Sequence, residues 1–128
     1  MNPSNAEIFL ISFFQLFDAT IKECKVEGMA VTGRIFWGND RNDTQSFRWH
    51  IEVSGHDIDR MISLCDVLHK NNLVSIDRLT VTEPELVEKL RSCNWEMEEI
   101  ECAINALMST EVKMVDDGEE TDSFYIHF

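Results

Sequence analysis

The chain has 128 residues, a length that fits one compact domain and excludes a large multidomain protein. Hydrophobic residues make up 44% of the chain and charged residues 27%, a globular composition that excludes wholesale disorder. The 24 acidic residues outnumber the 11 basic ones and give a net charge of −13, so we expect no direct binding to nucleic acid, whose phosphates require cationic side chains.

The longest apolar stretch covers residues 8–17 and is interrupted by Ser12 and Gln15. It is too short to cross a hydrocarbon core about 30 Å thick, so we expect no membrane span. Residues 1–7 contain Glu7 and neither Lys nor Arg, which is unlike the start of a signal peptide. These features predict a cytoplasmic protein that does not bind a membrane.

The cysteines occur at unrelated spacings and include no C-x-x-C pair. Such an arrangement predicts reduced, half-buried thiols rather than zinc ligands or a redox pair. We therefore expect neither a metal nor a cofactor. The four cysteines are Cys24, Cys65, Cys93 and Cys102.

The first predicted element is a long helix over residues 4–27. Ser4 and Glu7 have the spacing of a capping box, and Gly28 supplies a stop. The first half of this helix is apolar on almost every side. Two interpretations of the Phe-rich surface are open. It forms the core of the chain, which we favour, or part of it packs against a second copy in a homodimer.

The next predicted elements are two strands over residues 29–37 and 45–53. In the second strand the apolar residues Phe47, Trp49 and Ile51 alternate with polar ones, as expected when one face is buried. The segment between the strands is rich in Asn, Asp and Gly, which favour turns. The two strands are therefore expected to form a hairpin.

From Asp57 the apolar residues return to helical spacing and predict a second helix that ends near Asn71. A short β-like run over residues 73–81 follows. Thr82, with a proline and a glutamate in the next three positions, is then a strong start signal for a helix that continues to about Arg91.

A fourth helix is predicted over residues 95–108, and a β-hairpin over residues 111–128 closes the chain. The order of elements in residues 57–128 resembles a winged helix-turn-helix layout. This resemblance covers a little over half of the chain and rests on element order, without a motif of any specific family. It implies that residues 82–91 and 95–108 form the helix-turn-helix pair, with the terminal hairpin as the wing.

The predicted fold class is therefore α+β, with residues 1–128 in a single compact domain. A long N-terminal helix and a β-hairpin occupy residues 1–56. A winged-helix-like unit, made of a helix, a short strand, two helices and a terminal hairpin, occupies residues 57–128.

The negative charge is concentrated near the C-terminus. Residues 82–128 contain 13 acidic and 3 basic residues, a net charge of −10, whereas residues 1–81 have a net charge of −3. The helix in the recognition position contains four glutamates and no Lys or Arg, so it would repel DNA. We predict a binding surface for a basic protein partner, made of Glu96, Glu98, Glu99, Glu101, Asp116, Asp117, Glu119 and Glu120.

A local explanation of the same residues is also open. Carboxylates in the first turn of a helix are stabilised by the helix dipole, and acidic residues in a turn are readily solvated. Under this interpretation the acidic surface only keeps the protein soluble.

The sequence contains none of the common catalytic motifs: no Gly-rich phosphate loop, no G-x-S-x-G elbow and no H-E-x-x-H pair. Ser54, His56 and Asp57 are residue types of a catalytic triad, but as sequence neighbours they fit a turn that leads into an Asp-capped helix. We therefore expect no enzymatic activity.

Three functional hypotheses agree with these observations. The first is an acidic inhibitor that covers a basic partner, namely an immunity protein that neutralises a nuclease-type toxin. The second is a phage or mobile-element anti-defence protein that mimics the charge of DNA and blocks a restriction or CRISPR effector. The third is a winged-helix scaffold or regulator that acts through protein contacts.

Overall fold

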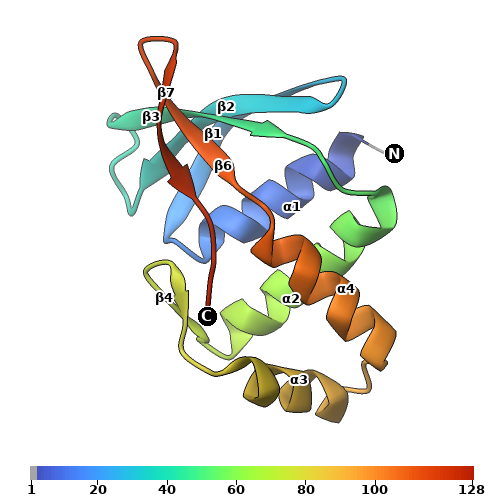
Figure 1. Ribbon diagram of the computed structural model, residues 1–128. Coiled ribbons are helices and arrows are strands. Elements are labelled where there is room, and N and C mark those ends of the chain that lie inside the picture. Colours follow the sequence, from blue (N-terminus) through green and yellow to red (C-terminus); the bar gives the residue numbers. More distant parts are fainter. Residues whose placement is uncertain (1–2) are drawn as a thin grey trace.

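The computed structural model describes residues 3–128, with side chains from Asn5 onward, and shows a mixed α+β fold (Figure 1). The elements are α1 (Pro3–Gln15), β1 (Ala19–Glu27), β2 (Ala30–Trp37), β3 (Thr44–His50), α2 (Gly55–Lys70), β4 (Val74–Ser75), β5 (Arg78–Leu79), α3 (Glu83–Ser92), α4 (Met97–Met108), β6 (Val112–Asp116) and β7 (Glu119–Phe124).

Five of the strands form one antiparallel sheet in the order β1-β2-β3-β6-β7. The helices lie together on one side of this sheet, with α1 nearest to it (Figure 1). The strands β4 and β5 pair only with each other in a separate short hairpin. None of the helices formed by residues 3–128 is both long enough and apolar enough to cross a membrane.

The prediction of one long N-terminal helix is wrong after Gln15. The chain turns at Asp18, whose φ is +59°, and continues as the edge strand β1. Asp tolerates this left-handed conformation better than most residues. The Ser4 side chain lies outside the described part of the chain, so its capping pair with Glu7 stays a prediction.

The aromatic side of α1 packs against the sheet. Phe9 lies 5.1 Å from Trp49 between ring centroids, and Phe14 lies 5.1 Å from Phe47. Phe9, Phe13 and Phe14 are fully buried within this one chain, which confirms the core interpretation for most of the Phe-rich surface. A homodimer contact would have to use the part of α1 that stays exposed.

The predicted hairpin of residues 29–37 and 45–53 is confirmed as β2 and β3, with Phe47, Trp49 and Ile51 buried as expected. The predicted helix from Asp57 is confirmed as α2, which begins slightly earlier. Its N-cap is Ser54, whose hydroxyl accepts a hydrogen bond from the backbone N–H of Asp57 at 3.2 Å. The capping residue is therefore Ser54 rather than Asp57.

The helix start at Thr82 is also confirmed, because the Thr82 hydroxyl accepts a hydrogen bond from the backbone N–H of Glu85 at 3.3 Å. The Glu85 carboxylate in turn accepts one from the backbone N–H of Thr82 at 3.2 Å. The run over residues 73–81 forms two short strands instead of one. Ile76, with a φ of +62°, lies in the turn between them.

The winged-helix detail is not confirmed. The terminal hairpin β6–β7 does form, but β6 pairs with β3 through the register Ser46↔Val115, Phe47↔Met114 and Arg48↔Lys113. The hairpin therefore extends the sheet of the N-terminal half instead of standing as a separate wing. The free side of β3 would otherwise expose unpaired backbone groups, and β6 satisfies them.

The helix α4 packs mainly against α2, and α2 packs against α1. The helix α2 therefore separates α4 from the N-terminal helix α1. The large apolar residues that hold α3 and α4 in place are buried, and Trp95, between the two helices, is partly buried. The buried residues are Leu86, Leu90, Ile100, Ile104 and Leu107.

Candidate functional site

The eight acidic residues predicted to bind a partner are all exposed, but they form two separate groups. The first, the α4 carboxylates, consists of Glu96, Glu98, Glu99 and Glu101. The second, the tip carboxylates, consists of Asp116, Asp117, Glu119 and Glu120. Figure 1 places the start of α4 and the turn between β6 and β7 at opposite ends of the molecule.

The separation follows from the chain direction. The 12 residues of α4 span about 18 Å and the 5 residues of β6 about 17 Å. The part of α4 after Glu101 and the part of β6 before Asp116 lie between the two groups. The sequence predicted one binding surface made of all eight residues. The two groups lie apart because β6 runs away from α4 along the five-stranded sheet.

Part of the α4 group has a local structural role. Glu96 occupies the N-cap position of α4, and its backbone N–H donates to the Glu99 carboxylate at 3.4 Å. The helix dipole also stabilises negative charge in the first turn of a helix. The local explanation therefore accounts for at least Glu96 and Glu99.

The tip carboxylates surround a two-residue turn. Asp117 and Gly118 have φ values of +52° and +82°, which matches the Asp-Gly turn preferred by tight hairpins. Asp116 and Glu119 pair across the end of the hairpin. Figure 1 shows this turn extending beyond the rest of the sheet. The hairpin therefore holds four carboxylates on a projecting, well-defined tip.

Within the described part of the chain, most of these carboxylates form no ion pair. Among the residues that the structure describes, Glu120 is the only one of the eight in an ion pair, at 3.5 Å from Arg48. Both side chains of that pair are 46% exposed, so the pair adds little to stability. The other three tip carboxylates keep their charge available to a partner.

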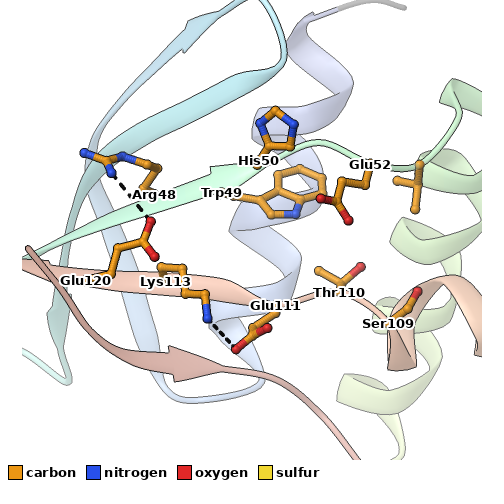
Figure 2. A pocket seen from close by; sticks show the side chains of 10 residues that line it. Arg48, Trp49, His50, Glu52, Ser109, Thr110, Glu111, Lys113 and Glu120 are labelled. Carbon is orange, nitrogen blue, oxygen red and sulfur yellow. Dashed lines mark hydrogen bonds and ion pairs between the residues drawn. The ribbon is translucent and has the colours of Figure 1, made fainter.

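A polar pocket of about 310 Å³ lies beside the base of the terminal hairpin, where β3 and β6 diverge. Figure 2 shows Arg48 and His50 on β3 and Lys113 on β6 around it. The paired register of these strands ends at Arg48↔Lys113, which leaves a fork between them. Sequence reasoning missed this pocket because its two walls are far apart in the chain.

The pocket is rich in internal polar contacts. The Lys113 ammonium donates to the Glu111 carboxylate at 2.8 Å, and this hydrogen bond raises the pKa of Lys113 and lowers that of Glu111. The hydroxyls of Ser109 and Thr110 donate to backbone carbonyls of α4 at 2.9 and 2.8 Å. These groups are therefore already engaged within the protein.

The sheet face opposite the helices carries several cations, and each is held by a neighbour. Lys25 pairs with Glu27 at 2.6 Å, and Arg34 donates from Nε to the Thr44 hydroxyl at 3.0 Å. Arg48 pairs with Glu120, as described above. We expect these cations to give only weak binding to nucleic acid.

The cysteines are free thiols with different exposure: Cys93 is exposed, Cys24 is half-buried and Cys65 is buried. Burial, with a smaller contribution from Glu7, raises the pKa of Cys24 to about 11. Burial also raises the pKa of Cys65. Among residues 3–128, no three His, Cys, Asp or Glu side chains are placed to hold a metal ion.

The partial burial and raised pKa of Cys24, beside the exposure of Cys93, predict selective alkylation. A raised pKa leaves about one Cys24 thiolate in a thousand at pH 8, so iodoacetamide should modify Cys93 and leave Cys24 almost unmodified. The rate at Cys24 should rise by about tenfold per pH unit above that. Peptide mapping by mass spectrometry measures both rates. Equal rates at Cys24 and Cys93 at pH 8 would contradict the described burial.

In comparisons with known proteins, no family model, curated protein or solved structure matches this chain.

Proposed function

We propose that this protein is an acidic, non-enzymatic binding protein whose projecting β6–β7 tip enters a cationic cleft of a partner protein. The observation that carries the proposal is the cluster of tip carboxylates, three of which have no ion-pair partner among the described residues. Complementary charge speeds encounter with a basic surface and excludes acidic competitors.

A nuclease-type toxin is the partner that fits this chemistry best. A nuclease must present cationic side chains in a concave site to hold its phosphate substrate. A narrow acidic hairpin has the complementary shape and charge. The tight Asp117-Gly118 turn fixes the tip before binding, which lowers the entropy lost on association. In this role the protein is an immunity protein.

The second hypothesis, mimicry of DNA charge, requires carboxylates along a continuous phosphate-like row. The distance between the tip carboxylates and the α4 carboxylates favours contact through one end of the molecule instead. The identity of the captured partner separates these hypotheses, because an anti-defence protein would bind a restriction or CRISPR effector. A scaffold protein would bind a partner without nucleic-acid chemistry.

The test uses a tip variant that carries Asp116→Asn, Asp117→Asn, Glu119→Gln and Glu120→Gln. Asn tolerates the positive φ at position 117, so the turn should survive. We expect the variant to bind the captured partner at least about tenfold more weakly, and wild-type affinity to fall as salt rises. Partners are captured from the native host lysate, and affinities are then measured by calorimetry at low and high salt.

The matched control replaces the α4 carboxylates, with Glu96→Gln, Glu98→Gln, Glu99→Gln and Glu101→Gln. It removes the same number of charges at the other end of the molecule and should retain wild-type affinity. If the α4 variant loses the partner and the tip variant keeps it, docking through the tip is wrong. If neither variant nor salt changes affinity, the acidic residues act only in solubility.

A further inference from the structure

The strand β1 forms one edge of the five-stranded sheet, and a groove of about 390 Å³ runs between this edge and α1. The helix contributes Glu7, Ile11 and Gln15, which are spaced four residues apart and therefore share one side of α1. The strand contributes residues 19–24. The groove is distant in sequence from the acidic tip, and its role does not depend on the proposed function.

Backbone hydrogen-bonding groups of β1 face the open side of this groove. In an antiparallel ladder, alternate residues direct their N–H and C=O groups to opposite neighbours. The backbone N–H of Ile51 donates to the Met29 carbonyl at 2.7 Å, just before β2 begins. The odd-numbered residues of β2 therefore direct their backbone N–H and C=O groups toward β3. The even-numbered residues, such as Thr32, direct theirs toward β1. Lys25 pairs with Thr32, and the preceding residue Cys24 therefore directs its backbone outward.

The same alternation applies on either side of Cys24. Val26 pairs with Val31, and Ile21 pairs with Ile35. Because Val31 and Ile35 direct their backbone groups toward β3, Ile21 and Val26 direct theirs away from β2, to the open edge of the sheet. Three residues of β1 thus offer free donors and acceptors along one line. An added strand would satisfy them, as in other sheet-edge complexes.

The floor of the groove is apolar. Ile11 lines the groove and is 51% exposed, although it is a large aliphatic residue. Ile21 and Cys24 are partly buried from the strand side. Because the raised pKa keeps the Cys24 thiol neutral near pH 7, it adds no charge to this floor.

The rim of the groove is acidic. Glu7 lies on the helix side and Glu23 on the strand side. Among the described residues that line the groove, Lys22 is the one cation, and its ammonium donates to the Arg41 carbonyl at 3.2 Å. The rim therefore favours cationic side chains beside the apolar floor.

We propose that this edge groove binds an extended peptide segment of another protein, which adds as a strand beside β1. An apolar side chain of the peptide packs on Ile11, and flanking Lys or Arg side chains meet Glu7 and Glu23. Backbone hydrogen bonds to Ile21, Cys24 and Val26 provide affinity, and the alternating side chains provide specificity.

Charge decides between this occupant and a second copy of the chain. Two copies would each carry a net charge of −13, so their approach is opposed by repulsion, whereas a basic peptide is attracted. The β-bulge between Ile21 and Glu23 also limits long edge-to-edge pairing, because it twists and interrupts the strand. A short segment on one side of the bulge is compatible with it.

The test measures binding of a fluorescent, N-acetylated Lys-Val-Arg-Val-Lys-Val peptide by anisotropy. Ile11→Gln should weaken binding by about tenfold, since half-burial of an aliphatic side chain contributes about 1.4 kcal/mol. Val26→Pro should abolish binding, because proline removes an outward N–H while an edge strand tolerates it. Met97→Gln, at a helical residue that is 44% exposed on α4, is the matched control and should bind like wild type.

Two further measurements make the result decisive. Hydrogen exchange should show that the peptide slows exchange at the amides of Ile21, Cys24 and Val26, and an acidic Glu-Val-Asp-Val-Glu-Val peptide should not bind. The proposal is overturned if Ile11→Gln and Met97→Gln bind equally, or if protection appears elsewhere. A second copy of the chain would be the occupant if sedimentation showed a dimer of the wild type and a monomer of Val26→Pro, and this result would also overturn the proposal. The tip variant should bind the peptide normally, which separates this test from that of the acidic tip.

Discussion

Replacing Phe14 by alanine should lower the free energy of unfolding by about 3–5 kcal/mol. The Phe14 ring is fully buried and lies 5.1 Å from Phe47 and 5.5 Å from Phe124 between ring centroids. It therefore connects α1 to the middle and to the far edge of the sheet, and the rigid neighbours would leave a cavity in its place. Such a loss is a large share of the stability of a typical domain, about 5–15 kcal/mol.

Urea denaturation followed by circular dichroism measures this change. The control is Ile8→Ala on the same helix, where the side chain is 46% exposed and the cost should stay below about 1 kcal/mol. Similar costs for Phe14→Ala and Ile8→Ala would mean that the face of α1 directed at the sheet is assigned incorrectly.

Replacing Gly33 by alanine should lower the free energy of unfolding by about 3 kcal/mol, at the upper end of the overpacking range. A Cβ atom at this position would meet the Glu23 carbonyl oxygen and, at 2.9 Å, the Phe47 ring. Gly33 pairs with Cys24 on one side and Phe47 on the other, so neither neighbouring strand has room to move independently. The cost comes from shifting the backbone of β1 or the aromatic core.

The control for this substitution is Thr32→Ala, at the adjacent exposed position of β2. It should change stability by less than about 0.5–1 kcal/mol, because it adds no atom to the packed face. Thermal unfolding of both variants gives the comparison. If Gly33→Ala were as stable as Thr32→Ala, the close approach of Phe47 to the backbone at Gly33 would not exist in solution.

The two proposed binding surfaces can be tested independently of each other. The acidic tip lies at the end of β6 and β7, while the peptide groove lies along β1 at the opposite edge of the sheet. Neutralising the tip should change salt-dependent affinity for a basic protein and leave peptide binding unaltered. Substitution at Ile11 should do the reverse. Variants of the two surfaces therefore act as controls for each other.

The elements with local signals could be predicted from the sequence. The Thr82 capping box fixed the start of α3, because its hydrogen bonds join residues only three positions apart. Strict alternation of apolar residues identified β3, and the Asp117-Gly118 pair marked the terminal turn. The exposure of the eight acidic residues also followed from their chemistry.

The strand over residues 19–27 could not be predicted locally, because it depends on pairing with β2. Its inward-facing residues are Ala19, Ile21, Cys24 and Val26, and the extra residue at the bulge lengthens one interval from two to three. That irregular spacing conceals the period of a strand and is compatible with the period of a helix. Pairing with β2 resolves the ambiguity, since it supplies backbone hydrogen bonds that no local pattern records.

Tertiary pairing also decided where the candidate surfaces lie. The pairing of β3 with β6 joins segments that are far apart in the chain, and it places the acidic tip away from the α4 carboxylates. The edge groove likewise exists only because β1 folds back beside α1. The residue types were readable from the sequence. Their grouping in space depends on contacts between segments that are distant in the chain. Loop geometry and burial of the shared core determine which of these segments pair.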